Sequence, residues 1–256
     1  MRLILNNLSK YSQELNDFFP GRFGLFGRIS LKIINSVQEK ILKSFGDIKD
    51  SDQFYLTGGT ALSYFYLKHR QSNDLDFFTS TEEIVGSFSH QLEDHLKANG
   101  FKCQRQRGLH SFVELIVTLD NETTLIHLAV DAAFRFEPTK EFPAFLHLKV
   151  DNLTDIASNK LLALFGRATL RDFIDVYFLI KKEGFSKEQL IDTAKKKDPG
   201  FDLYWLGVAF ERINTFDSKS TDIFMLVKPL PIEELKTFFN QWRKEIAGEL
   251  KPFKGQ

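Results

Sequence analysis

The segment from residue 54 to residue 79, FYLTGGTALSYFYLKHRQSNDLDFFT, constrains the fold of this chain more than any other. FYLTGG predicts a short buried strand that runs into a turn at Gly58-Gly59. TALSYFYLKHR predicts a helix that begins at the turn, and DLDFFT predicts a second strand. This succession is typical of an α/β (α+β) fold with a small mixed sheet.

The rest of the chain up to about residue 150 mixes helical and strand-like patterns. Apolar residues at helical spacing predict a helix within residues 29–45. Residues 1–28 combine Phe with Gly and Pro, which indicates an arm or loop with aromatic anchors. From Phe101 to about Val150, alternating or continuous apolar runs predict strands, with the residues LDNET as a turn between two of them.

A further helix is expected over about 80–99. Ser80 or Thr81 is the expected N-cap, with Glu82 and Glu83 in the first turn. Gly100 stands at the stop position, where glycine is favoured.

After residue 150 the pattern is helical throughout. TLRD and SKEQ resemble capping boxes, and Pro231 is the expected first residue of the last helix. The predicted helices cover residues 154–165, 169–183, 186–197, 202–213 and 231–247. We therefore predict two domains, an α/β domain over residues 1–150 and an all-helical domain over residues 151–256 that closes the other side of a cleft.

Composition excludes several classes of protein. The 256 residues carry 34 basic and 34 acidic side chains, and zero net charge argues against a protein that coats nucleic acid indiscriminately. Cys103 is the only cysteine, so neither an intrachain disulfide nor a cysteine-based metal site is expected. The apolar run near the N-terminus is too short for a signal peptide or a membrane span. We expect a cytoplasmic protein with no membrane partner.

Asp74 and Asp76 alternate along the predicted strand DLDFFT. Both carboxylates therefore leave one face, about 7 Å apart at the backbone, while Leu75 and Phe77 face a core. Two such carboxylates repel unless a cation lies between them, and Mg²⁺ prefers oxygen ligands of this kind. Two exposed acids at a strand end are the alternative interpretation.

The turn at Gly58-Gly59 precedes this acidic pair. Without side chains there, backbone N–H groups at a helix N-terminus can approach a phosphate, although a tight turn without a ligand has the same sequence. Thr60 is expected to cap the helix or to donate its hydroxyl to the phosphate. Arg70 and Ser72 lie between the turn and the acids. Arg70 either binds phosphate oxygens through two hydrogen bonds of its guanidinium or is a surface arginine at the end of the helix.

Asp131, in LAVDAAF, is a third candidate carboxylate. An acid inside an apolar strand is costly unless it is paired or bound to a metal. Three carboxylates on neighbouring strands are expected to hold two Mg²⁺ ions, with Mn²⁺ as the alternative metal. The other interpretation places Asp131 at a strand end, where it caps a turn. The six histidines show no metal-ligand spacing.

The segment 54–79 closely resembles the opening motif of the AbiEii/AbiGii family of nucleotidyltransferases, the toxins of abortive-infection toxin–antitoxin pairs in the polymerase-beta-like superfamily. The match covers the Gly-Gly turn, the following helix, the Arg-x-Ser before the acids and Asp-Leu-Asp. LTDIASNKLLALFGRATLRDFIDVYFL resembles the second conserved block of the family. In that block the matching residues are Asp155, Lys160, Arg167, Arg171, Asp172 and Asp175, with Asn159 just before the lysine.

The residues of the second block also allow plain structural roles. Lys160 lies in an apolar helical stripe, so its ammonium either extends to water or reaches a buried anion. The family resemblance implies that this anion is the triphosphate of the nucleotide. Arg171 and Asp175 have the spacing of a surface ion pair, and Asp172 that of a helix-capping acid. For Asp172 and Asp175, scaffold and catalysis remain equally open. Lys195–Lys197 are expected to complement a helix dipole in solvent.

We therefore expect a metal-dependent nucleotidyltransferase of the fold described above. It would move a nucleoside monophosphate from a nucleoside triphosphate to an acceptor hydroxyl and release pyrophosphate. The resemblance implies an RNA acceptor, with the 3′ end of tRNA as the leading candidate. It also implies a toxin that is restrained by a separately encoded antitoxin. The candidate catalytic residues are Asp74, Asp76, Asp131, Lys160, Asp172 and Asp175; the candidate nucleotide-binding residues are Gly58, Gly59, Thr60, Arg70, Ser72 and Lys160.

Two other functions fit the same residues. One is a nucleotide-binding module without transfer activity that acts through a protein partner, although binding alone would not need three acids. The other is metal-assisted phosphate-ester hydrolysis, which would release inorganic phosphate in place of pyrophosphate.

Overall fold

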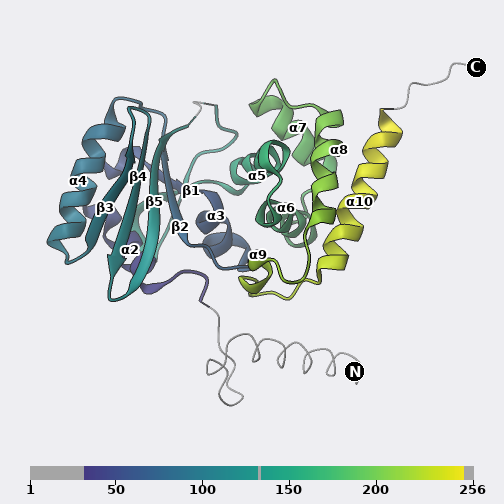
Figure 1. Cartoon of the computed structure of the whole chain (residues 1–256). Helices are drawn as coiled ribbons and strands as arrows, with labels where there is room; N and C mark the ends of the chain where they lie inside the picture. Colours follow the sequence, from purple (N-terminus) through teal and green to yellow (C-terminus); the bar gives the residue numbers. More distant parts are fainter. Residues whose placement is uncertain (1–31, 132–133, 251–256) are drawn as a thin grey trace, which may run out of the picture. The chain divides into compact units, whose positions relative to one another are not determined.

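The described part of the chain contains one mixed sheet. The computed structural model describes residues 32–131 and 134–250, so the arm predicted at 1–28 lies outside it. The strand order is β3-β4-β5-β2-β1-β7-β6 (Figure 1), and β2 runs antiparallel to β1 and parallel to β5, which confirms the expected fold class. The strands are β1 (Tyr55–Thr57), β2 (Asp74–Thr79), β3 (Lys102–Gly108), β4 (Phe112–Leu119), β5 (Glu122–Val130), β6 (Lys140–Phe142) and β7 (Phe145–Val150).

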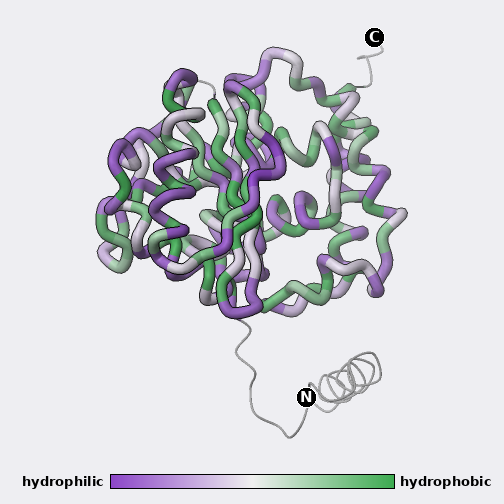
Figure 2. Tube along the Cα trace, turned by 60° about the vertical axis from the view of Figure 1, so that its left-hand side comes forward, coloured by the Kyte–Doolittle hydropathy of each residue, from purple (hydrophilic) through white to green (hydrophobic). Residues whose placement is uncertain are grey.

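The two faces of the sheet differ as the alternation in the sequence requires. On β2, Leu75 and Phe77 are fully buried, while Asp74 and Asp76 lie half-buried on the other face. The apolar face is covered by helices α2 (Ser36–Ser44) and α4 (Ile84–Ala98) (Figure 1). Hydrophobic and hydrophilic residues alternate along the chain trace accordingly (Figure 2). The opposite face is thus left free to carry polar side chains.

Helix α4 begins later than the sequence predicts. It starts at Ile84 with Glu83 at the N-cap position, so neither Ser80 nor Thr81 caps it; the N–H of Thr81 instead donates a hydrogen bond to the hydroxyl of Thr79 at the end of β2. The two glutamates therefore precede the helix and do not lie in its first turn. Gly100, with φ of +84°, ends the helix as expected.

The helix after the glycine turn has an unusual form. A short α-helical turn, α3 (Gly58–Thr60), continues into the π-helical segment η3 (Ala61–Leu67). The N–H of Lys68 bonds the carbonyl of Ser63, five residues earlier, at 2.9 Å. The predicted helix thus ends three residues before Arg70, whose backbone forms a bridge with Leu226. Arg70 is therefore not a helix-closing surface residue.

Apart from the isolated bridge at Leu226, the elements that follow β7 within residues 151–250 are helical, as predicted. They are α5 (Leu153–Arg167), α6 (Leu170–Glu183), α7 (Lys187–Lys197), α8 (Leu203–Glu211), η4 (Arg212–Thr215), α9 (Thr221–Phe224) and α10 (Ile232–Glu249). The capping boxes predicted at Thr169 and Ser186 are both present. Pro231 is the N-cap of α10, one position before the helix proper. The division into two domains at residue 150 stays a prediction.

Among the described residues, no helix has the length and apolar character needed to cross a membrane.

Candidate functional site

A pocket of about 480 Å³ lies between the polar face of the sheet and helix α5. Thr60, Asp172 and Asp175 of the predicted site do not line it. The predicted site residues that do line it are Gly58, Gly59, Arg70, Ser72, Asp74, Asp76, Asp131 and Lys160. The tertiary structure thus brings most of the residues singled out in the sequence to one place.

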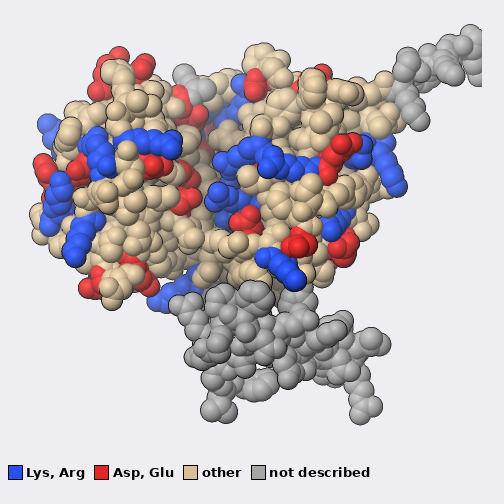
Figure 3. All heavy atoms as spheres, viewed as in Figure 1, with Lys and Arg blue, Asp and Glu red and all other residues tan. Residues whose placement is uncertain are grey.

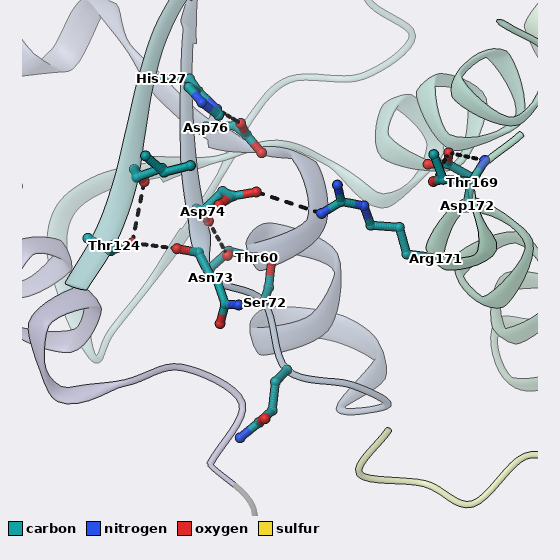
Figure 4. A network of polar contacts seen from close by, with 12 residues as sticks. Thr60, Ser72, Asn73, Asp74, Asp76, Thr124, His127, Thr169, Arg171 and Asp172 are labelled. Carbon is teal, nitrogen blue, oxygen red and sulfur yellow. Dashed lines mark hydrogen bonds and ion pairs between the residues drawn. The ribbon is translucent and has the colours of Figure 1, made fainter. Parts of the chain in front are cut away.

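Asp74 and Asp76 face this pocket from strand β2, as the alternation predicts (Figure 4). Burial, and then the nearby charge of Asp76, raise the pKa of Asp74 above its ordinary value. Arg171, at the start of α6, places its Nη1 3.8 Å from Oδ2 of Asp74. The site therefore concentrates negative charge that an added cation would stabilise.

His127 is a site residue that the sequence did not reveal. It lies opposite Asp76 on the neighbouring strand β5, with its Nδ1 2.8 Å from Oδ1 of Asp76 (Figure 4). This hydrogen bond raises the pKa of His127 although burial opposes it. Its Nε2 lies 3.3 Å from Oε2 of Glu114 on β4. The available signal was strand alternation, because His127 stands four positions before Asp131 and thus on the same face of the strand that the sequence predicted there.

Asp131 lies directly after strand β5, which ends at Val130. It therefore lies at a strand end and not inside an apolar strand, while its predicted role in holding a metal stays a prediction. The hydroxyl of Tyr55 donates a hydrogen bond to its Oδ2 at 2.5 Å, and its backbone N–H bonds the carbonyl of Thr79. These contacts hold Asp131 at the edge of the pocket.

The glycine turn is required by close contacts. Gly58 has φ of +72°, and a Cβ there would lie 2.0 Å from Oδ2 of Asp76. A Cβ on Gly59 would lie 2.9 Å from Nη2 of Arg70 and 3.0 Å from Oγ of Ser72. Glycine at both positions therefore lets the acid, the guanidinium and the hydroxyl approach the turn.

Thr60 differs from its predicted role. The N-cap of α3 is Thr57, and the buried hydroxyl of Thr60 donates a hydrogen bond to the backbone carbonyl of Asp74 (Figure 4). It therefore neither caps the helix nor faces the pocket. Its contact fixes the start of β2, and with it the acidic pair, against the glycine turn.

Asp175 joins two of the cationic residues of the pocket. Its fully buried carboxylate accepts two hydrogen bonds from Arg70 and lies 2.8 Å from Nζ of Lys160. Nε2 of His69 lies 2.8 Å from Oδ1 of Asp175. Burial raises the pKa of Asp175, but the charges of Arg70 and Lys160 outweigh it and hold the pKa well below its usual range. Asp175 therefore acts on the pocket through its neighbours.

Asp172, like Asp175, does not line the pocket but contacts a residue that does. It is fully buried, closes the capping box with Thr169 and accepts two hydrogen bonds from Arg167, which lines the pocket. The side chain of Arg171 pairs with Asp74, whereas Asp175 pairs with His69, Arg70 and Lys160, so the alternative of a surface ion pair within α6 is wrong. The contacts of Asp172 and Asp175 are those of positioning residues.

Lys197 also differs from its expected role. Its side chain is only 9% exposed, and its Nζ lies 2.7 Å from Oδ1 of the buried Asp155 and 2.9 Å from Oδ1 of Asn159. It is therefore not a solvent-exposed lysine at a helix end. Asn159, in turn, lines the pocket beside Lys160.

Opposite charges face each other across the pocket. Figure 3 shows acidic side chains on the sheet side of the hollow and basic side chains on the helical side. The acidic side includes Asp74 and Asp76, and the basic side includes Lys160, Arg167 and Arg171. Carboxylates on one wall suit a divalent cation, and cations on the other suit phosphate oxygens.

Comparison with known proteins gives matches over most of the chain. A family model described as "Nucleotidyl transferase AbiEii toxin, Type IV TA system" matches residues 40–255. An uncharacterized protein of Aquifex aeolicus (strain VF5) is 27% identical over 217 residues, which cover 84% of this chain and 98% of that protein.

Solved structures share the fold. JHP933 from Helicobacter pylori aligns with a TM-score of 0.52 at 20% identity, over 84% of this chain and 90% of that chain. A further H. pylori protein, provisionally named a nucleotidyltransferase, has a TM-score of 0.53 at 17% identity, over 90% of this chain and 100% of that chain. MenT4, a nucleotidyltransferase toxin from Mycobacterium tuberculosis H37Rv, has a TM-score of 0.50 at 16% identity, over 84% of this chain and 83% of that chain.

Proposed function

The chain belongs to the AbiEii family of nucleotidyl transferases, and on this premise we propose that it uses Mg²⁺ to transfer a nucleoside monophosphate from a nucleoside triphosphate to a hydroxyl of RNA, with the 3′ end of tRNA as the leading acceptor. The observation that carries the proposal is the pocket in which Asp74 and Asp76 face Gly58-Gly59 and a wall of basic side chains.

The donor set supports a divalent metal. Asp74 and Asp76 present carboxylates from one strand face toward the pocket, and carboxylate oxygens are the ligands that Mg²⁺ prefers. These two residues would hold the ion, which when bound neutralises phosphate charge. Among the described residues, no group of three or more His, Cys, Asp or Glu side chains is arranged to hold a metal ion. The two-ion site that includes Asp131 therefore stays a prediction, as does Mn²⁺ as an alternative.

The basic wall supports binding of the triphosphate. Arg70 and Lys160 are held by Asp175 at the pocket, and Ser72 lies beside the backbone of Gly59. These groups bind and orient the phosphates, so that the acceptor oxygen can bond to the α-phosphorus while the bond from this phosphorus to the β-phosphate oxygen breaks. The electron pair leaves with pyrophosphate, and solvent takes up the hydroxyl proton. Transfer of this kind rests on positioning and charge neutralisation.

Family membership supports a toxin that is restrained by a separately encoded antitoxin. Expression of the wild-type chain without an antitoxin is expected to arrest growth of a bacterial host, whereas the Asp76→Ala variant is expected to leave growth unchanged. Equal growth with both chains would contradict the toxin role while leaving the enzymatic role in place.

Labelled-nucleotide transfer tests the enzymatic role. The full chain is incubated with total tRNA and each labelled nucleoside triphosphate, with Mg²⁺ or with EDTA, beside Asp76→Ala. Asp94→Ala, at an exposed position of helix α4, is the matched control. Label in tRNA with wild type and control, lost with EDTA and with Asp76→Ala, supports the proposal. Labelling that persists in Asp76→Ala overturns it, and release of inorganic phosphate in place of pyrophosphate indicates hydrolysis.

A further inference from the structure

Asn159 gives the pocket an uncharged polar group among apolar ones. It lines the pocket from helix α5 together with Ile156, Leu162 and Ala163. Its neighbour in the sequence, Lys160, carries the charge that suits a phosphate. Lys160 and Arg167 of the same helix are the groups suited to phosphate, whereas the apolar side chains beside Asn159 form an apolar wall that, with its one amide, suits a flat heterocycle with a polar edge.

The orientation of this amide is fixed by Lys197. The ammonium of Lys197 lies 2.9 Å from Oδ1 of Asn159, and because an ammonium only donates, the amide oxygen must face it. Lys197 is itself held 2.7 Å from Oδ1 of Asp155. Asp155 also accepts hydrogen bonds from Asn152 Nδ2 and from the backbone N–H groups of Phe136 and Glu137. Lys197 is therefore held by an ion pair with a buried carboxylate whose own position is fixed by further hydrogen bonds.

Because its oxygen is directed at Lys197, Asn159 has its Nδ2 group on the other side of the amide. No group in the described ranges, 32–131 and 134–250, forms a hydrogen bond with this nitrogen. An asparagine that was free to flip would present either a donor or an acceptor. Here the contact with Lys197 fixes the amide so that the unpartnered end is the donor.

We propose that Asn159 selects the nucleobase of the donor nucleotide, acting as a hydrogen-bond donor whose polarity is set by Lys197. This inference rests on the proposed nucleotidyltransferase function. The base lies against the apolar wall and directs an acceptor atom, a carbonyl oxygen or a ring nitrogen, toward Nδ2. Bases of equal size that differ in donor and acceptor pattern, such as cytosine and uracil or adenine and guanine, are thereby distinguished.

Titration calorimetry with CTP, UTP, ATP and GTP in the presence of Mg²⁺ tests this inference without an acceptor. Wild type is expected to discriminate by about tenfold within at least one pair of equal-sized bases, the effect of one hydrogen bond matched or unmatched. Asn159→Asp places an acceptor beside Lys197 and is expected to invert that preference. Lys197→Met frees the amide of Asn159 to flip and is expected to abolish the preference between the two bases.

The control variant is Lys196→Met, at an exposed neighbouring position of α7, which should keep the wild-type ranking. Circular dichroism establishes that each variant is folded. If folded Asn159→Asp and Lys197→Met keep the wild-type order of affinities, or if wild type does not discriminate within either pair, the inference is overturned while the transferase function stands. If wild type binds no nucleotide at all, the proposed function itself fails.

Discussion

The carboxylate of Asp175 binds the guanidinium of Arg70 through two parallel hydrogen bonds, Nε to Oδ1 at 2.7 Å and Nη2 to Oδ2 at 2.8 Å. The two residues are 105 positions apart in the sequence. This contact joins helix α6 to the segment that leads into strand β2, and Lys160 of α5 binds the same carboxylate. Two of the cations that face the pocket, Arg70 and Lys160, are therefore positioned by an acid that does not line it.

Replacing this acid is expected to damage both folding and catalysis. Asp175→Asn leaves Arg70 and Lys160 buried without a counter-charge, and loss of one partner of a buried pair costs about 3–5 kcal/mol. Urea unfolding is expected to show that loss, and the folded variant should bind nucleoside triphosphate more weakly. Asp192→Asn, at an exposed position of α7, is the control and should match wild type. An unchanged unfolding midpoint for Asp175→Asn would contradict the positioning role.

The buried His69 is expected to make stability depend on pH. Burial lowers its pKa from the ordinary value of 6.5, in spite of its contact with Asp175. Below pH 6.5 the unfolded chain binds a proton at this residue that the folded chain does not, so the free energy of unfolding falls as the pH drops toward the folded pKa. His69→Gln should have a smaller loss of stability between pH 7 and pH 5 than wild type. Parallel denaturant curves for the two proteins would contradict this.

Asp175 contributes a second dependence at lower pH. Because its folded pKa lies well below the ordinary 3.8, its stabilisation is fully present above that value and is lost as the pH falls through the folded pKa. The Asp175→Asn variant should therefore have a flatter stability profile in the acid range. A profile as steep as that of wild type would mean that other carboxylates dominate acid unfolding.

A single methyl group at the glycine turn is expected to disturb the acidic pair. In Gly58→Ala the new Cβ would lie 2.0 Å from Oδ2 of Asp76, and the backbone φ of +72° adds a strain of about 1–2 kcal/mol. Transfer activity should fall at least tenfold. Gly86→Ala, within helix α4, meets no atom within 4 Å and is expected to stabilise the protein by about 0.5–1 kcal/mol with full activity. Equal activity of the two variants would rule out the proposed role of Gly58.

Arg171 is expected to act on nucleotide binding without supporting the fold. Its half-exposed side chain lies 3.8 Å from Asp74, and surface substitutions change stability by about 0.5 kcal/mol or less. Arg171→Met should raise the Kd for nucleoside triphosphate several-fold, most clearly at low salt, with an unchanged thermal midpoint. Arg212→Met, at an exposed position of η4, is the matched control. An equal Kd for the two variants would remove Arg171 from the binding site.

Local patterns predicted those features that depend on near neighbours in the chain. Strand alternation placed Asp74 and Asp76 on one face because side-chain direction in a strand has a period of two. The capping boxes of α6 and α7 were found because both partners lie within three residues. The start of α4 was misplaced because the chain first makes a turn at Glu82 and Glu83, after a contact between the N–H of Thr81 and the hydroxyl of Thr79 that the capping pattern does not reveal.

Partners from distant segments were not predicted. His127 meets Asp76 only because β5 pairs with β2 in one particular register. Lys197 looked like a solvent-exposed lysine until the packing of α7 against α5 brought it to Asp155 and Asn159. No spacing in the sequence encodes such contacts, because strand register and helix packing are set by the whole core.

The fold class, the glycine turn, the acidic strand face and the family could all be read from the amino-acid sequence, since they depend on periodicity and on residues close together in the chain. Which side chains face the pocket and which support it became clear from the three-dimensional arrangement alone. Thr60, Asp172 and Asp175 support the pocket because the Thr60 hydroxyl bonds a backbone carbonyl and the two carboxylates bond arginine side chains. A buried polar group must find its partner wherever the fold brings one, and that choice depends on packing across the whole chain.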